Sequence, residues 1–548
     1  MKQVSARTRR RQPRERSLSL PSLGAQKSSH STHRGLLWWG CGVLAAAGVL
    51  RLLFLTLKPL HHDEGVNGFF LVSLFHGGYY HYDPSNFHGP TLYYFGLITA
   101  GINNLFHWGS GLSTVALRLV PALFGIGIVW LVLCLRRQLG VFAVVSAATI
   151  TAVSPGFVYF SRYFIHEIPF VFFTLGIVVA WMRYRETGKQ FYFLLAAASA
   201  ALLFATKETW IITVAVWLGA LPCTRTYLYL HQSLRRKPEA PDVKPRRIKT
   251  QNENVAPSLE LQPTPESDPL SDIWLYATAA LIFVTIGILF YSSFFTNFPK
   301  GVYDSVRTFT YWTKTGRTDD PHPWFTYFNW LWQEEAPILL LGSIGIAIAL
   351  FQARHRFAVF TAFWSMGMLA AYSLITYKTP WLALSIMLPL TLMAGHALGQ
   401  CYGRKSLRMV TPFVAGAAIA FSLYQAIDIS FFHYDDDSYA YVYAHTRRDF
   451  ESLIHEVESI AASNPAGKEI GITVMSPEHW PMPWYLRDYA HVGYWGHIVP
   501  TSEPIVIALE PQTLEVERML GNKYRRVSTH DLRPGNVLVL YLRKDIQP

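Results

Sequence analysis

The polar residues that follow the first long apolar stretch are the ones best suited to chemistry. The segment HHDEG places Asp63 and Glu64 side by side there, and SRYFIHE places Glu167 after a later apolar stretch. A carboxylate within hydrogen-bond reach of a hydroxyl can act as a general base. Isolated loop acids are usually only solvated, but these adjoin a large apolar surface. We therefore predict catalytic roles for Asp63, Glu64 and Glu167, with Asp63 as the main candidate, and interfacial positions for His61 and His62.

Four basic residues are predicted to lie on the same side of the apolar region as these acids. Arg118 lies in ALRLVPALFG, Arg162 in SRYFIHE, Lys207 in TKET and Lys378 in YKTPW. Cations at the depth of lipid headgroups can bind a lipid phosphate, so we predict a phosphate-binding or donor-binding role for all four. The alternative is that each side chain snorkels to the interface or forms a salt bridge, for instance Lys207 with Glu208.

A further polar segment, DDPHPWFTYFNWLWQEE, contains His322 and Glu335. A divalent metal ion would need imidazole or hard oxygen ligands. His322 could supply one of them together with Asp63 or Glu64, and Glu335 could also complete the site. The alternative is an interfacial histidine, because a lone histidine lacks the clustered partners that a metal site needs.

The elements that would position these residues are membrane helices. Of the 548 residues, 51% are hydrophobic, which indicates an α-helical polytopic membrane protein. Apolar stretches of spanning length predict about eleven transmembrane helices. They are residues 36–57, 113–135, 139–157, 167–182, 191–206, 209–222, 273–295, 336–352, 357–376, 380–400 and 409–427.

The basic residues indicate how these helices are oriented. The net charge is +12, but beyond residue 34 the cations are dispersed between apolar stretches, which favours orientation in a bilayer over binding of nucleic acid. Residues 1–34 are predicted to be a disordered basic tail in the cytoplasm. A secretory signal is the alternative, but the following apolar stretch is too long for a signal core and lacks a cleavage site. The other predicted cytoplasmic links contain Arg136, Arg137, Arg183, Arg185, Lys189, the run 225–249, Arg354, Arg356, Arg404, Lys405 and Arg408.

One apolar segment tests this topology. HGPTLYYFGLITAGINNLF, residues 88–106, is apolar enough to span, but a further span there would place every later basic cluster outside. We therefore predict an interfacial helix in a first outer loop. The resulting divisions are a membrane domain at 35–427, outer loops at 58–112 and 296–335, a disordered cytoplasmic linker at 224–271 and an exported domain at 428–548.

The exported domain alternates two kinds of segment. EIGITVM, PIVIALE and NVLVLYL are strand-like, whereas DFESLIHEVESIAAS and PQTLEVERML are helix-like, so we predict a small α/β domain. The four cysteines, Cys41, Cys134, Cys223 and Cys401, lie in or near the predicted helices. The exported domain must therefore be stable without a disulfide.

Several of these motifs occur together in one known group of proteins. The acidic pair in HHDEG, HGPTLYY, LRLVPALFG and SRYFIHE resemble the polyprenyl-phosphate-dependent glycosyltransferases of the multispanning C-type superfamily, which includes protein O-mannosyltransferases and lipid A aminoarabinose transferases. YFSRYFIHE, TKET, YKTPW and WPMPWYLRDY look most like the subgroup described as flippase-activity-associated proteins. The resemblance covers the membrane region and part of the exported domain.

The resemblance implies a role for particular residues. The first-loop acid would be the catalytic base or would position the acceptor, which points to Asp63, with Glu64 as the second candidate. Glu167 matches the second-loop acid, and His322 resembles a histidine that binds metal in the aminoarabinose transferases. The sequence departs from the protein mannosyltransferases because its second-loop acid is Glu and its exported domain has no β-trefoil repeats, so a protein acceptor is not implied.

The predicted function is an inverting transfer of a sugar from a polyprenyl-phosphate donor to an acceptor at the outer face of the plasma membrane. Because phosphate is a good leaving group, one base and several cations would suffice. The alternatives are a flippase or transporter subunit for lipid-linked sugars and a non-catalytic scaffold of a polysaccharide assembly complex. A flippase would favour charges midway along several helices and internal repeats, whereas the polar groups of this sequence lie mostly at the predicted outer ends.

Overall fold

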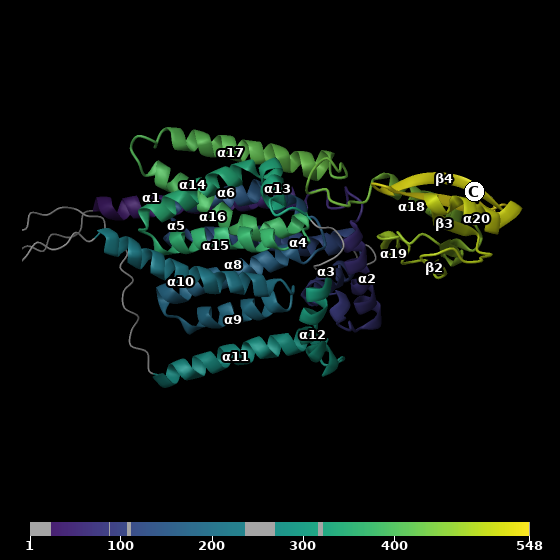
Figure 1. The fold of residues 1–548 in the computed structure, drawn as a ribbon, viewed down its shortest axis with the longest axis horizontal. Coiled ribbons are helices and arrows are strands. Elements are labelled where there is room, and N and C mark those ends of the chain that lie inside the picture. Colours follow the sequence, from purple (N-terminus) through teal and green to yellow (C-terminus); the bar gives the residue numbers. More distant parts are fainter. Residues whose placement is uncertain (1–22, 87, 107–110, 236–268, 316–321, 547–548) are drawn as a thin grey trace, which may run out of the picture.

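The protein combines a long helical bundle with a small α/β domain at one end (Figure 1). The computed structural model describes residues 23–86, 88–106, 111–235, 269–315 and 322–546. The first 22 residues of the predicted tail lie outside this range. Helix α1 (Leu23–Leu52) begins at Leu23, so residues 23–34 are helical where a disordered tail was predicted.

Seven helices of the described chain are long and apolar enough to cross a membrane. Helices α13 (Thr326–Glu334) and α14 (Ala336–Gln352), which meet at 114°, would make an eighth span if they count as one. The predicted count of about eleven spans is therefore not confirmed, although every predicted stretch contains a helix. The seven are α4 (Thr114–Cys134), α8 (Glu167–Thr187), α10 (Trp210–Arg235), α11 (Pro269–Tyr291), α15 (Arg356–Leu374), α16 (Ala383–Tyr402) with η2 (Pro380–Leu382), and α17 (Val410–Ile427) with η3 (Asp428–Phe432).

The remaining predicted stretches form shorter or bent helices. They are the apolar part of α1, α6 (Val141–Val153), α9 (Gln190–Phe204) and α14, which is bent against α13 of the predicted outer loop. Short helices α5 (Arg136–Leu139) and α7 (Pro155–Phe160) flank α6. Helix α10 continues to Arg235, so residues 224–235 are helical where a linker was predicted, and residues 236–268 of that linker lie outside the described chain.

Helix α16 is the centre of the bundle. Its apolar window is 94% buried, compared with 17% for α11 and 22% for α17. Helices α6, α14 and α15 pack around α16, whereas α11 and α17 form opposite margins of the bundle (Figure 1). An apolar surface is therefore left on the outer helices, as expected for a bundle surrounded by lipid.

The predicted inner loops lie together at one end of the bundle. Arg137 contacts Glu186 at 3.1 Å, and Arg183 donates to the Cys134 carbonyl at 3.0 Å. The Tyr402 ring stacks on Phe142 with centroids 4.1 Å apart. These contacts join the ends of α4, α8, α16 and the start of α6, so the loops alternate between two ends of the bundle as the charge pattern predicts.

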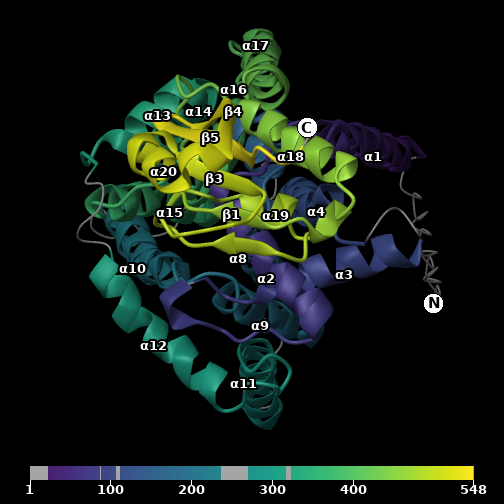
Figure 2. The same ribbon diagram turned by 90° about the vertical axis from the view of Figure 1, so that its right-hand side faces the viewer.

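The opposite end carries helices that lie across the bundle. They are α2 (His62–Gly77), α3 (Thr91–Leu105) and α12 (Lys300–Thr315). In the end-on view of Figure 2, α3 and α12 are seen along their length while α11 and α17 are seen end-on. Helix α3 is the segment that we predict to be interfacial, and it is not among the helices long and apolar enough to span.

The C-terminal domain is a five-stranded mixed sheet with strand order β2-β1-β3-β5-β4. Strand β1 pairs in parallel with β2 and β3, whereas β5 is antiparallel to β3 and β4, and Ile507 lies opposite Leu540. The strands are β1 (Ile472–Val474), β2 (Val492–Tyr494), β3 (Ile505–Leu509), β4 (Tyr524–Arg533) and β5 (Asn536–Arg543), and the helices are α18 (Asp449–Ser463), α19 (Met482–Tyr485) and α20 (Thr513–Leu520).

Alternating side chains of the sheet form two cores. Ile505 and Ile507 of β3 pack with α18, whereas Val506 and Ala508 pack with α20 on the other face. This is the period of two that a strand imposes. All five strand-like and helix-like segments predicted in this domain contain the expected element. The four cysteines are free, so the domain is held by these two cores without a disulfide.

Candidate active site

The N-terminus of α2 holds Asp63 at the end of the bundle that faces the C-terminal domain. His61 is the N-cap: its Nδ1 accepts from the Asp63 N–H at 3.1 Å, and the His61 N–H donates to Glu64 Oε2 at 3.0 Å. This reciprocal pair is a capping box. Because Nδ1 accepts, the proton is on Nε2, which lies 3.1 Å from the Tyr443 carbonyl. Burial lowers the pKa of His61, so it is a neutral structural cap inside the protein and not the interfacial residue that the sequence predicts.

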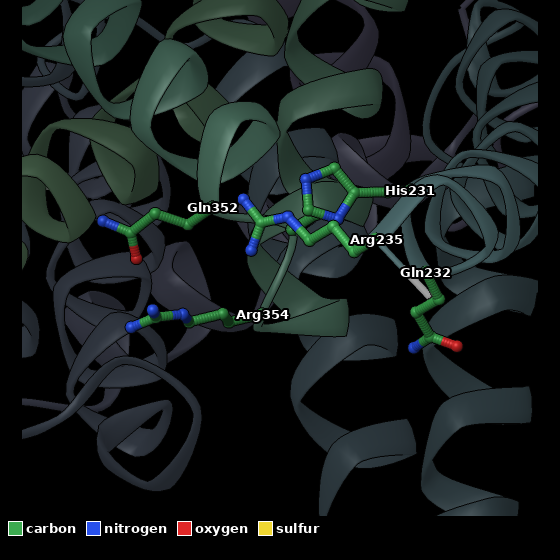
Figure 3. Close-up of a pocket in the computed structure, with 6 residues that line it drawn as sticks. His231, Gln232, Arg235, Gln352 and Arg354 are labelled. Carbon is green, nitrogen blue, oxygen red and sulfur yellow. The ribbon is translucent and has the colours of Figure 1, made fainter. Parts of the chain in front are cut away.

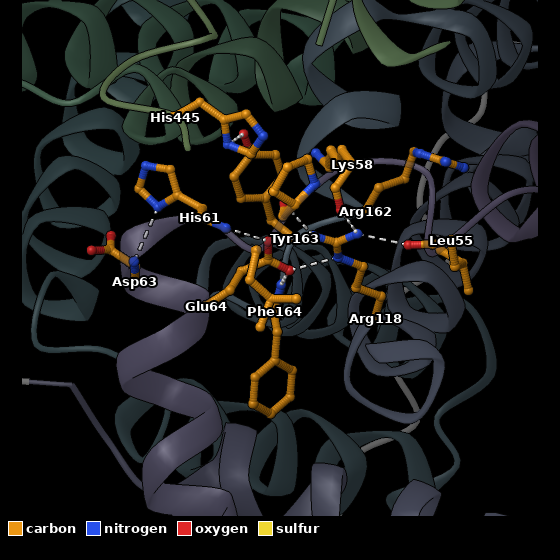
Figure 4. Close-up of polar contacts among 12 residues, drawn as sticks. Leu55, Lys58, His61, Asp63, Glu64, Arg118, Arg162, Tyr163, Phe164 and His445 are labelled. Atoms are coloured by element: carbon orange, nitrogen blue, oxygen red, sulfur yellow. Dashed lines mark hydrogen bonds and ion pairs between the residues drawn. The ribbon is translucent and has the colours of Figure 1, made fainter. Parts of the chain in front are cut away.

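The two adjacent carboxylates have opposite surroundings. Asp63 and Glu64 point to different sides of α2 (Figure 4). Glu64 is fully buried, whereas Asp63 is partly exposed. Within the described residues, no hydrogen bond or ion pair to the Asp63 carboxylate is found. Asp63 is therefore the acid of the pair that an acceptor could reach.

Glu64 forms a buried ion pair with Arg118 of α4 (Figure 4). Arg118 Nε lies 2.8 Å from Glu64 Oε1 and Nη2 lies 2.7 Å from Oε2. The Phe164 N–H also donates to Oε1, at 2.9 Å. Burial favours the neutral acid, but Arg118 and then Lys58 keep the pKa of Glu64 below its usual value. These contacts join α2, α4 and the second predicted outer loop.

Arg118 has no donor left for a phosphate. Besides Glu64, it donates to the carbonyls of Leu55, Lys58 and Pro59 at 2.7–2.9 Å. Five hydrogen bonds account for the five N–H groups of a guanidinium. The predicted donor-binding role of Arg118 is therefore disfavoured, and its position fits a structural anchor for the segment after α1.

Arg162 caps the C-terminal end of α1. Its guanidinium donates to the carbonyls of Leu53 at 2.5 Å and Phe54 at 2.6 Å, and lies 4.5 Å above the Phe431 ring. Cations near the last carbonyls of a helix are stabilising because of the helix dipole. This role competes with the predicted binding of a lipid phosphate.

Glu167 and Lys207 form a second buried ion pair. Lys207 bonds Glu167, whereas Glu208 contacts His88 Nδ1 at 3.1 Å. Burial alone lowers the pKa of Lys207, but the carboxylates of Glu167 and Glu208 raise it above its usual value. Lys207 therefore forms a salt bridge, as the alternative interpretation predicts, but its partner is Glu167 and not the adjacent Glu208.

The HGPT and ATKET segments are held against each other beside this pair. The Gly89 N–H donates to the Thr206 carbonyl at 3.1 Å, and the Thr91 N–H donates to the Ala205 carbonyl at 3.3 Å. A Cβ at residue 89 would lie 2.0 Å from the Ala205 oxygen, so only glycine fits there. His88 next to it was not predicted, and its side chain is 31% exposed.

The segment YKTPW contains Tyr377 and Lys378. Burial and then the charge of Asp63 raise the pKa of Tyr377 to about 12. Lys378 itself is buried and donates to the carbonyls of Ser373, at 3.1 Å, and Ile375. Its predicted contact with a phosphate would have to replace these bonds.

The C-terminal domain reaches the same site. Arg533 Nη1 lies 2.9 Å from His62 Nδ1, and its Nη2 bonds Glu478. The Tyr485 hydroxyl accepts from the Leu60 N–H at 2.9 Å. The segment WPMPWYLRDY therefore packs on α2 next to Asp63. Sequence reasoning singled out this segment but did not predict what it touches.

Lys58 and His445 are buried polar groups that the sequence did not reveal. Lys58 Nζ lies 3.3 Å from the Tyr163 ring centroid and 4.0 Å from that of Tyr159 (Figure 4), with no hydrogen-bond partner among the described residues. His445 Nδ1 lies 2.8 Å from the Tyr163 hydroxyl. A lysine just after an apolar stretch usually snorkels, so nothing in the sequence indicated an aromatic cage.

The residues predicted to bind metal do not assemble. No group of three or more His, Cys, Asp or Glu residues in the described chain could hold a metal ion. The His322 ring packs on Trp330 with centroids 5.5 Å apart. Both carboxylate oxygens of Glu64 accept hydrogen bonds from Arg118. Glu335 accepts from Ser154 Oγ at 2.7 Å and from a backbone N–H at the same distance.

Part of the chain matches one protein family, and the whole fold is similar to that of a solved membrane protein. Residues 94–298 match the family described as dolichyl-phosphate-mannose-protein mannosyltransferase. The structure of ArnT from Cupriavidus metallidurans bound to undecaprenyl phosphate covers 93% of this chain and 99% of its own, with 14% identity and a TM-score of 0.62. Its apo structure gives 13% identity and a TM-score of 0.60 over 93% and 98% of the two chains.

A weaker likeness is found to the Archaeoglobus fulgidus oligosaccharyltransferase in complex with Zn and sulfate. It covers 93% of this chain and 75% of the other, with 13% identity and a TM-score of 0.48, too low to support an argument. A search of curated proteins found no match.

Proposed function

We propose that this chain, which carries a domain of the mannosyltransferase family and has the fold of ArnT, is a glycosyltransferase of the C-type superfamily that takes its sugar from a polyprenyl phosphate. The family match and the fold support glycosyl transfer in general. We further propose that the transfer inverts the anomeric centre and takes place at the outer face of the membrane. We also propose that the chain is a member of the flippase-activity-associated subgroup.

The observation that carries the proposal is the setting of Asp63. Its carboxylate is partly exposed at the end of a helix that is fixed on three sides, by the His61 cap, by the Glu64–Arg118 pair and by the C-terminal domain. A general base must be held in place while it stays free to accept a proton. We propose that Asp63 orients and deprotonates the acceptor hydroxyl.

Tyr377 and the Glu167–Lys207 pair would lie on the donor side of the site. The charges of Asp63, Lys207 and Glu167 all act on the pKa of Tyr377, which supports grouping these residues in one site. We propose that Lys207 meets the phosphate when the donor displaces it from Glu167. A cation there would stabilise the negative charge that develops on the leaving phosphate.

The proposed donor is a lipid-linked sugar, because the apolar bundle provides a surface next to the site against which a lipid chain can lie. Undecaprenyl phosphate is bound by the solved ArnT structure, and a donor of that class fits a site at the end of an apolar bundle. A divalent metal ion remains part of the proposal, although no group of three or more His, Cys, Asp or Glu residues in the described part of the chain is placed to hold one.

The test is transfer of labelled sugar from defined polyprenyl-phosphate sugars by the purified protein in lipid nanodiscs. Wild-type protein should release polyprenyl phosphate and label an acceptor, and Asp63→Asn should lower the turnover number by roughly 10²–10⁴ with an unchanged melting temperature. Full activity in Asp63→Asn would exclude the proposed base. Movement of the donor across the bilayer without transfer would instead support the flippase alternative.

A further inference from the structure

The end of the bundle opposite the C-terminal domain has a cavity that is open to the surface and that the proposed function does not use. It has a volume of about 480 Å³ and is lined by His231, Gln232, Arg235, Gln352, Ala353 and Arg354 (Figure 3). This volume is within the range of about 300–1,000 Å³ that small-molecule sites have. The cavity lies where α10 ends, at Arg235, and where α14 gives way to α15.

The lining is suited to an anion. It contains two guanidinium groups, one imidazole and two side-chain amides, and no carboxylate. The C-terminal end of α14 contributes a negative partial charge of about half an elementary charge. The two formal positive charges of Arg235 and Arg354 outweigh it, so the cavity is net positive.

The two sides of the cavity are held together. The Tyr227 hydroxyl of α10 donates to the Leu350 carbonyl of α14 at 2.8 Å. The His231 ring, one turn further along α10, lies with its centroid 6.2 Å from that of Tyr227 at an interplanar angle of 28°. These contacts fix α10 against α14 beside the cavity and hold the His231 ring on Tyr227.

We propose that this cavity binds the phosphate group of an anionic membrane lipid. Guanidinium groups match phosphate oxygens with paired N–H donors, and the amides of Gln232 and Gln352 can donate to a headgroup hydroxyl. The apolar helices α10 and α15 extend from the cavity along the bundle, so acyl chains would lie against them. A soluble phosphate presents the same chemistry without the chains.

The experiment measures binding to the full chain in detergent, with short-chain phosphatidylglycerol, short-chain phosphatidylcholine and inorganic phosphate as separate probes. We expect phosphatidylglycerol to bind wild type at least about tenfold more tightly than the Arg235→Gln/Arg354→Gln variant, and more tightly than phosphatidylcholine binds. Arg356→Gln, an exposed cation outside the lining, is the matched control and should bind like wild type.

A second variant separates loss of binding from loss of folding. Gln352→Trp keeps both arginines and fills the cavity, and it should weaken phosphatidylglycerol binding to a similar extent. Tight binding of inorganic phosphate that the double variant loses would assign the cavity to a soluble phosphate instead. Equal binding by all variants, or an equal loss in Arg356→Gln, would overturn the proposal, because a general surface charge would then explain it.

Discussion

Arg533 of the C-terminal domain contacts His62, which is the neighbour of Asp63 in α2. The two nitrogens are 2.9 Å apart although the residues are 471 positions apart in the chain. Arg533 also bonds Glu478, so it lies between a residue of its own domain and the helix that carries the proposed base. The small domain thus contacts the helix that carries the proposed base.

Arg533→Ala is expected to lower activity through the position of α2. Removal of the guanidinium leaves the partly buried His62 without its partner and loosens the domain from the bundle. We expect turnover to fall about tenfold, with a smaller change in the KM for the donor. Steady-state kinetics checks this, and Arg525→Ala, an exposed residue of the same strand, should behave like wild type. An effect on the donor KM alone would contradict a positioning role.

Stability should depend on pH through His62. Burial lowers the pKa of His62 from 6.5 to about 4, so the unfolded chain binds a proton at a higher pH than the folded chain does. Above pH 6.5 His62 is neutral in both states, and the free energy of unfolding is not reduced by its protonation. As the pH falls towards 4, the unfolded chain binds a proton that the folded chain does not, so the free energy of unfolding decreases. The full loss is on the order of 3 kcal/mol.

Thermal unfolding at a series of pH values tests this. The melting temperature should fall between pH 6.5 and pH 4, and His62→Gln should reduce the slope. The slope should not vanish, because burial also lowers the pKa of His61. A variant with the same slope as wild type would show that other groups are responsible.

The sequence was sufficient for what depends on local pattern. The apolar stretches locate the helices, the strand-like runs PIVIALE and NVLVLYL locate β3 and β5, and the acid after the first apolar stretch makes Asp63 a candidate base. These features need no knowledge of distant residues, because periodicity and polarity are properties of neighbours in the chain.

The sequence was insufficient for what depends on distant pairing. The sequence gives both Asp63 and Glu64 as candidate bases, but Arg118, 54 positions from Glu64, makes Glu64 structural. Lys207 would be assigned to the adjacent Glu208, yet its partner is Glu167. Adjacent side chains generally point apart, and only the fold determines which distant side chain fills the space.

Gly65 allows the C-terminal domain to pack on α2. A Cβ there would lie 2.6 Å from Pro481 Cα, which is backbone and cannot move aside easily. Gly65→Ala should therefore displace α19 from α2 and lower both activity and melting temperature. Gly77→Ala is the control, because its Cβ would be 3.8 Å from the nearest atom, in Tyr79. If Gly65→Ala matched the control in a limited-proteolysis assay, the close contact would be unimportant.

Glu64→Gln should affect folding much more than Asp63→Asn does. The substitution leaves the Arg118 charge buried without a counter-charge, which costs roughly 3–5 kcal/mol. We expect a lower yield and a lower melting temperature for Glu64→Gln and a normal melting temperature for Asp63→Asn. Chemical denaturation of both proteins in the same detergent compares them directly. Equal stability would mean that the Glu64–Arg118 pair contributes little.

The Glu167–Lys207 pair can be separated into a structural and a chemical contribution by a double-mutant cycle. Glu167→Gln alone leaves the buried Lys207 without its main partner, and Lys207→Met alone leaves the Glu167 carboxylate, so each should lower the melting temperature. The double variant Glu167→Gln/Lys207→Met removes both charges and should recover much of this stability. If Lys207 meets the donor phosphate, the double variant should remain inactive despite its recovered stability, because a stable fold then lacks the cation that the leaving phosphate needs. Recovery of activity together with stability would show that the pair is only structural.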